Sequence, residues 1–159
     1  METHYNRLYR WLYHLAHDRH VAEDLTQETF LKAFAALAKF QAGSNFRAWL
    51  FRIAHNSFIN LRRAARRQRE GLPEDLPARE AGPAERAEHT EERALLAQAV
   101  KRLPSDFRAA FLLRVEEGLS FRQIANVLGL TEETARWRVF KARQKLLRVF
   151  TPPLEQEKP

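Results

Sequence analysis

Apolar residues recur along the chain at the three- and four-residue steps of an amphipathic helix, and no segment alternates as a half-buried strand does. In the first segment this stripe consists of Tyr5, Leu8, Tyr9, Leu12, Leu15 and Ala16. The pattern predicts two further helices, over about 21–40 and 45–69, separated by the turn sequence QAGSN. In the predicted helix 21–40, Phe30, Ala33, Phe34 and Leu37 are expected on the core side.

Helical periodicity is lost between residues 70 and 92. This stretch holds eight acidic residues against two arginines, with prolines at 73, 77 and 83, so it cannot bury enough apolar surface to order itself. Periodicity resumes at Arg93 and predicts helices over about 93–103, 105–117, 120–128 and 131–150, with Ser105 as an N-cap. The expected fold is all-α: a domain over 1–69, an acidic flexible linker over 70–92, a domain over 93–150 and a disordered tail over 151–159.

The composition of the chain limits the class of its binding partner and the compartment in which it acts. The 159 residues carry 27 Lys and Arg against 20 Asp and Glu, a net charge of +7. This charge favours a polyanionic partner such as nucleic acid or an acidic membrane, and a solvated basic surface is the alternative. The chain has no cysteine, which excludes disulfides and thiolate metal ligands and fits the reducing cytoplasm. No apolar run is long enough to cross a bilayer, and the first residues lack the features of a signal peptide. We therefore expect a cytoplasmic protein without a cofactor or metal.

The segment LSFRQIANVLGLTEETARWRVFKAR has the pattern of a helix-turn-helix motif. Ile124 and Leu128 lie one turn apart, Gly129 suits the tight turn, and Thr131 is placed to cap the next helix. Along that helix Ala135, Val139, Ala142 and Leu146 share one arc and are expected in the core. The alternative is an ordinary helical hairpin with a charged outer face.

Cationic residues occupy the flanks of this last helix. Between residues 131 and 148 there are six basic residues against two acidic ones, which suits a recognition helix in the major groove of DNA. Trp137 has two interpretations of equal weight, contact with DNA or packing against a neighbouring helix.

Two features of the first domain also suggest binding. On the predicted helix 21–40, Asp24, Glu28 and Leu31 share the side opposite the core, with Gln27 at its edge, as expected of a surface that docks a helix of another protein. A solvated face with one stray Leu is the alternative. The helix 45–69 interleaves aromatic and basic residues, which favours stacking of single-stranded bases, although the arginines at its end also complement the helix dipole.

Taken together, the segments AEDLTQETFLKAF, FRAWLFRIAHNSFINLRR and LPSDFRAAFLLRVEEGLSFRQIANVLGLTEETARWRVFKARQKL resemble a bacterial sigma factor of the extracytoplasmic-function subgroup of the sigma-70 family. The resemblance implies a region 2 three-helix bundle and a region 4 helix-turn-helix domain. It also implies a transcription initiation factor that binds core RNA polymerase, recognises promoter DNA and helps to open it, with an anti-sigma factor as a further partner and without membrane insertion.

The resemblance assigns three sets of residues. Asp24, Gln27, Glu28 and Leu31 are expected to bind the clamp helices of the polymerase β′ subunit. The residues expected at the minus-ten element are Ser44, Asn45, Phe46, Arg47, Asn56, Arg62, Arg63 and Arg66. Those expected at the minus-thirty-five element are Ser120, Arg122, Thr131, Thr134, Arg136, Trp137, Arg138 and Lys141. No residue is expected to be catalytic.

Three other classes of protein are alternatives. A helix-turn-helix repressor would leave the first domain unexplained, and an adaptor without DNA binding would leave the charge of the last helix unexplained. An enzyme is suggested by His14, His17 and His20 alone, but their three-residue steps drift around a helix and no zincin pattern is present.

Overall fold

The computed structural model describes residues 3–69 and 91–150, and within these ranges the chain is helical with no strand. The helices of the first domain are α1 (His4–Ala16), α2 (Arg19–Ala35), the short η1 (Leu37–Lys39) and α3 (Phe46–Gln68). Those of the second are α4 (Glu91–Arg102), α5 (Ser105–Val115), α6 (Phe121–Leu128) and α7 (Glu132–Phe150). The all-α class is confirmed, whereas the linker and tail lie outside the described residues, apart from Glu91 and Glu92, which begin α4.

Local sequence signals set the starts of the first three helices. Thr3 caps α1 by accepting from the Asn6 amide at 3.3 Å, and Asp18 caps α2 by accepting from the His20 and Val21 amides at 2.9 and 3.3 Å. Asn45 caps α3 through the Ala48 amide at 3.1 Å. Each side chain satisfies a backbone donor that has no partner within its helix.

The first domain is a bundle of α1, α2 and α3. Leu8, Leu12 and Leu15 are buried as predicted, whereas Tyr5 is partly exposed and stacks on Phe30 at 5.7 Å. Trp11, which the periodicity analysis left out, is fully buried and meets Phe51 edge to face at 5.1 Å between ring centroids.

The predicted second helix is too long, and two of its core assignments are wrong. It ends at Ala35, and the chain continues through η1 rather than as an α-helix to Phe40. The last turn of α2 still packs on α3, where Lys32 donates to the Ser57 hydroxyl at 2.9 Å. The buried arc of α2 consists of Ala22, Leu25, Thr26, Thr29 and Ala33, and Phe34 lies outside it. Phe34 is consequently 80% exposed and Leu37 50% exposed.

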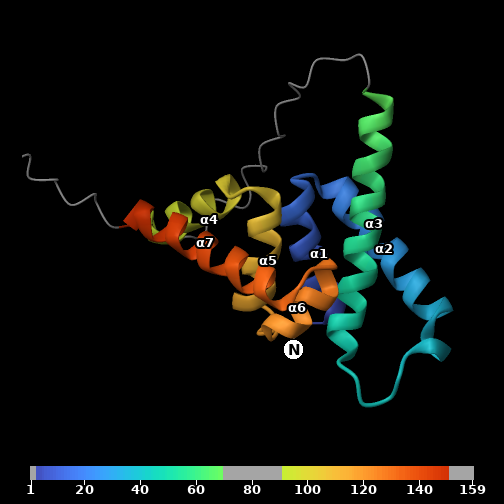
Figure 1. Cartoon of the computed structure of the whole chain (residues 1–159). Helices are drawn as coiled ribbons and strands as arrows, with labels where there is room; N and C mark the ends of the chain where they lie inside the picture. Colours follow the sequence, from blue (N-terminus) through green and yellow to red (C-terminus); the bar gives the residue numbers. More distant parts are fainter. Residues whose placement is uncertain (1–2, 70–90, 151–159) are drawn as a thin grey trace, which may run out of the picture.

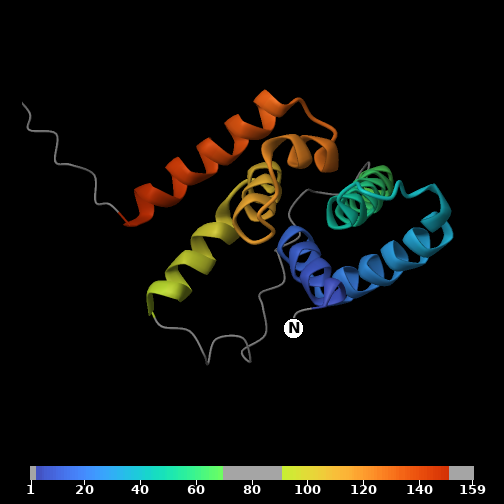
Figure 2. The ribbon, with the colours of Figure 1, turned by 90° about the horizontal axis from the view of Figure 1, so that it is seen from below.

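In the second domain α5, α6 and α7 pack together, with α4 against the C-terminal part of α7 (Figures 1 and 2). Ala135, Val139, Ala142 and Leu146 are all buried, as the periodicity predicted. Ser105 is the first residue of α5 rather than its cap, because Pro104 takes the cap position and makes no side-chain capping bond.

The two domains pack on each other, α3 against α6 and α1 against α5, and their buried side chains form one continuous core. At this interface the Trp11 indole donates to the Ala109 carbonyl at 3.3 Å. Arg52 of α3 donates to the Asn126 side-chain oxygen of α6 at 3.0 Å. The described residues therefore form a closed arrangement, in which each domain covers part of the other.

Candidate nucleic-acid and protein interfaces

The predicted docking residues share the outer side of α2. Asp24, Gln27 and Glu28 are exposed, and Leu31 is 72% exposed. Glu28 forms an ion pair with Lys32 at 2.9 Å, one turn further along. Phe34 adds a second large apolar side chain to this surface, which we call the α2 face. Exposed apolar groups beside carboxylates are the features of a surface that binds a partner.

The loop before α3 is held by local bonds. The Ser44 hydroxyl donates to the Gln41 carbonyl at 2.7 Å, and Asn45 caps the helix. Phe46 is half-buried, with its ring 5.5 Å from that of Phe40 and 5.7 Å from that of Trp49. The structure therefore brings Ser44, Asn45 and Phe46 together in an ordered turn, with the Phe46 ring inside an aromatic cluster.

The residues predicted along α3 divide into two groups. Asn56, Arg63 and Arg66 are exposed. Arg47 and Arg62 instead turn towards the second domain, where Arg47 bonds Glu117 at 3.3–3.4 Å and Arg62 donates to the Ser105 hydroxyl at 3.4 Å. The sequence carried no signal for this division, because it depends on how the domains pack.

The helix-turn-helix is built as its capping residues predict. Ser120 and Gln123 form a reciprocal capping box at the start of α6, and Gly129 ends this helix with φ of 69° in the left-handed region. The Thr131 hydroxyl accepts from the Thr134 amide at 3.1 Å, so Thr131 caps α7. Arg122 is exposed in the first turn of α6.

The outer side of α7 is braced by neighbouring aromatic rings. Arg136 pairs with Glu132 at 3.5 Å and lies over the Phe121 ring at 5.2 Å from its centre. Trp137 packs against Phe107 of α5 at 5.5 Å between ring centroids, yet half of its surface is exposed. The packing interpretation of Trp137 is therefore confirmed, and its contact with DNA stays a prediction. Arg138 and Lys141, on the same helix, are half-buried.

Two histidines lie at the interface between the domains. The pKa of His17 is lowered to about 4 by burial first and then by the charges of Arg108 and Lys101. The pKa of His55 is also lowered to about 4, by burial, while Asp106 raises it and Arg138 lowers it. Both imidazoles are therefore neutral near pH 7, and the interface disfavours their charged forms.

Acidification should weaken the closed arrangement. Between about pH 6.5 and about pH 4 the unfolded chain binds more protons than the folded chain at His17 and His55, so stability falls as the pH decreases through this range. Thermal unfolding between about pH 7 and about pH 5 should show this decrease, and His55→Gln should reduce its slope. His20→Gln, at an exposed histidine of α2, is the control. A slope unchanged in His55→Gln would contradict the assignment.

The three histidines considered for metal binding do not form a cluster. Within 3–69 and 91–150, no three His, Asp or Glu side chains lie close enough together to hold a metal ion. His17 instead ends α1 in the left-handed conformation with φ of 54°. In the same part of the chain no helix is long and apolar enough to cross a membrane.

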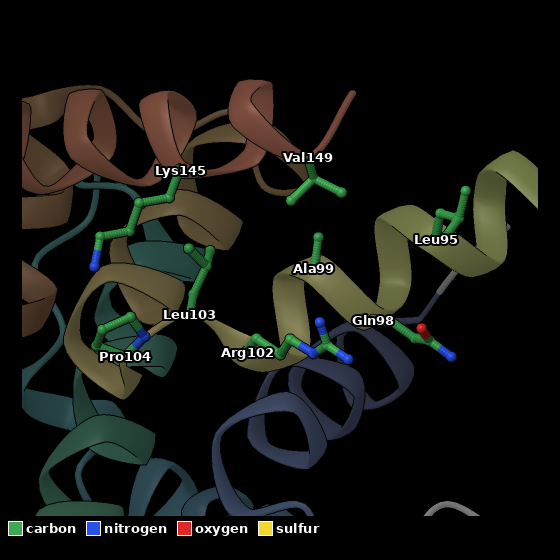
Figure 3. A pocket seen from close by; sticks show the side chains of 8 residues that line it. All are labelled: Leu95, Gln98, Ala99, Arg102, Leu103, Pro104, Lys145 and Val149. Carbon is green, nitrogen blue, oxygen red and sulfur yellow. The ribbon is translucent and has the colours of Figure 1, made fainter. Parts of the chain in front are cut away.

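A pocket of about 170 Å³ lies between α4 and α7 (Figure 3). Leu95 and Ala99 of α4 and Val149 of α7 provide much of its apolar lining, and Arg102 and Lys145 stand at its sides. None of the predicted site residues lines it.

Comparison with known proteins gives two matches to family models, which follow the two domains. Residues 1–68 match Sigma-70 region 2, and residues 93–146 match Sigma-70 region 4. The chain belongs to the extracytoplasmic-function subgroup of the sigma-70 family. Members of this family are transcription initiation factors of bacterial RNA polymerase. The region 2 match also accounts for the domain that a helix-turn-helix repressor leaves unexplained.

Two relatives illustrate the similarity. The chain is 41% identical to the ECF RNA polymerase sigma factor SigE of Mycolicibacterium smegmatis over 92% of its own length, but it spans only 58% of the length of that protein. It is 36% identical to the RNA polymerase sigma-H factor of Pseudomonas aeruginosa, with 88% of this chain and 78% of that protein covered.

A solved structure extends the likeness to the arrangement of the domains. The sigma factor RpoE from Bartonella quintana, in complex with the anti-sigma factor NepR, superposes with a TM-score of 0.81 at 28% identity. The superposition covers 95% of this chain and 94% of RpoE. Because it includes both domains at once, regions 2 and 4 must be placed similarly in the two proteins.

Proposed function

We propose that this sigma factor binds core RNA polymerase through the α2 face, reads promoter DNA through α3 and α7, and helps to open the duplex. The observation that carries the proposal is the joint occurrence of the exposed α2 face and a capped helix-turn-helix in one chain of this family. Run-off transcription with core polymerase on a library of genomic promoters tests it. The absence of transcripts that depend on the chain would refute it.

Within this proposal, the clamp helices of the β′ subunit are the partner of the α2 face. The exposed carboxylates of Asp24 and Glu28 provide charge for a basic helix, and Leu31 provides apolar area at the centre of the face. The minus-ten element is assigned to the turn at 44–46 and to α3. The minus-thirty-five element is assigned to α6 and α7.

We also infer that an anti-sigma factor controls the chain. The support is the superposition on RpoE, whose structure was solved as a complex with NepR. An inhibitor of such a sigma factor would either cover the surfaces that polymerase and DNA need or favour an arrangement that polymerase cannot use. Co-purification of the chain with a partner that inhibits run-off transcription is the expected result.

Substitutions on α7 should separate base contacts from phosphate contacts. Arg136 is exposed at the outer side of α7, so Arg136→Ala should cost about 1–3 kcal/mol and relax preference at one promoter position. Arg138→Ala and Lys141→Ala should instead weaken binding evenly on all sequences and lower the salt slope by about one each. The measurement is holoenzyme binding to duplexes randomised at the upstream element, over a salt series.

Arg143→Ala is the matched control, because Arg143 is exposed on α7 but lies outside the predicted contact set. If Arg136→Ala keeps the wild-type preference, the assignment of Arg136 to a base is wrong.

A further inference from the structure

Glu117 lies in the turn between α5 and α6, and its side chain is only 3% exposed. Its Oε2 atom accepts from Nη1 of Arg7 at 3.3 Å and from Nη1 of Arg47 at 3.4 Å. Its backbone carbonyl also accepts from Arg47, at 3.3 Å. Arg7 belongs to α1 and Arg47 to the first turn of α3, so one carboxylate of region 4 joins two helices of region 2.

A carboxylate in this position depends strongly on its partners. Withdrawing a charge from water is costly, and two guanidinium groups offset that cost only while the domains stay together. When the domains separate, water can solvate Glu117 and the arginines again. The contact therefore stabilises the closed arrangement in particular, rather than the fold of either domain.

Arg47 belongs to the residues proposed to bind the opened promoter strand. Carboxylate and phosphate oxygens offer a guanidinium the same kind of acceptor, so a DNA phosphate that approaches Nη1 of Arg47 competes with Glu117 for that donor. Arg62, of the same proposed set, donates to Ser105 of region 4. The closed arrangement thus uses two arginines that the strand would need.

We propose that Glu117 is an intramolecular competitor of the promoter strand, which occupies Arg47 and keeps the free chain closed until the two domains separate. This inference rests on the proposed role of α3 in binding the opened strand. It predicts that removing the charge of Glu117 opens the chain and exposes Arg47 to DNA.

Distances between the domains test the opening directly. The chain has no cysteine, so Asn60→Cys on α3 and Arg143→Cys on α7 provide two unique sites for spin labels in the full chain. Both side chains are exposed and lie outside the proposed contact sets. Double electron–electron resonance should give one narrow distance distribution for the parent and a longer, broader one after Glu117→Gln.

Binding of a fluorescent single-stranded DNA of random sequence tests the competition. If most of the parent chains are closed and cannot bind DNA, the Glu117→Gln variant should bind the single-stranded DNA about 5- to 10-fold more tightly. The reason is that the fraction of open chains sets the apparent affinity. Glu92→Gln makes the same change in net charge at an exposed position of α4. It should leave the distance distribution unchanged and the DNA affinity within about 2-fold of that of the parent. Arg7→Met is a second opening variant that leaves Arg47 in place.

Unchanged distances in both Glu117→Gln and Arg7→Met would overturn the proposal, as would an equal gain in DNA affinity in Glu92→Gln. Longer distances without tighter binding would overturn the competitor role of Glu117. Run-off transcription by the parent chain reports separately on the proposed function, so its failure and the failure of this inference are distinguishable.

Discussion

Reversing two charges on α2 should abolish binding to core polymerase. Asp24→Lys together with Glu28→Lys replaces two exposed carboxylates by ammonium groups on the same side of the helix. Like charges facing a basic partner cost several kcal/mol, so the affinity for core should fall by roughly 100-fold or more. The fold should survive, because neither side chain is part of the core. Fluorescence anisotropy of the labelled chain titrated with core polymerase measures the loss.

The control is Glu132→Lys with Glu133→Lys in the first turn of α7. This pair makes the same change in net charge, also at exposed positions, but outside the α2 face. The affinity of this control variant for core polymerase should stay within about 2-fold of that of the parent, because surface charges distant from an interface are largely screened. Equal losses in the two double variants would mean that net charge, rather than the α2 face, governs binding.

Phe34 extends this prediction beyond the residues found from the sequence. Phe34 is 80% exposed, and Leu31, which lies one turn before it, is 72% exposed, so the two apolar side chains can form one patch on the α2 face. Phe34→Ala should therefore weaken core binding by about 1–3 kcal/mol without lowering the free energy of unfolding. Phe58→Ala, which removes a buried ring of α3, should show the opposite pattern.

The features that sequence reasoning predicted well are local ones. The buried arc of α7, the cap at Thr131 and the turn at Gly129 depend on residues within one or two turns of each other. Helical periodicity and capping chemistry act over that range, so they can be read from the residues alone. The exposure of Asp24, Glu28 and Leu31 was predictable for the same reason.

The features that were missed depend on contacts between distant segments. Phe34 was assigned to the core, but the side of α2 that packs on α1 and α3 carries Thr29 and Ala33 and leaves Phe34 exposed. Glu117 lies beside the exposed Glu116, and nothing in the local sequence distinguishes the buried one from its neighbour. Trp11 lies outside the stripe predicted for α1, and its indole N–H donates to the Ala109 carbonyl of the other domain. The burial of Glu117 and the indole contact of Trp11 follow only from the closed arrangement.

Arg108 provides the second large expected effect, and sequence reasoning did not single it out. It lies in the first turn of α5 and is only 4% exposed. Its Nη1 donates to the carbonyls of Lys101 and Leu103 at 2.7 and 3.2 Å, where α4 ends. These acceptors would otherwise lack partners at a helix C-terminus. Burial, and then the charge of Arg62, lower the pKa of Arg108. The surroundings therefore disfavour the charged guanidinium, which the hydrogen bonds to the two carbonyls stabilise.

Arg108→Ala should lower the free energy of unfolding by about 3–5 kcal/mol, because it removes buried hydrogen bonds and leaves a cavity. Arg108→Met keeps most of the side-chain volume and removes the desolvated charge. It should therefore lower the free energy of unfolding by less, about 1–2 kcal/mol. Arg102→Ala is the control, because Arg102 is exposed at the end of α4 and should cost about 0.5 kcal/mol or less. Urea unfolding followed by circular dichroism measures all three.

The comparison between Arg108→Met and Arg108→Ala also bears on DNA binding. Arg108 fixes the junction of α4 and α5, and α5 carries Phe107, on which Trp137 of α7 rests. If this junction positions α7, Arg108→Met should weaken holoenzyme binding to duplex DNA even at temperatures where the variant is fully folded. Full DNA affinity in a folded Arg108→Met chain would limit Arg108 to stability. A loss confined to Arg108→Ala would assign the effect to unfolding alone.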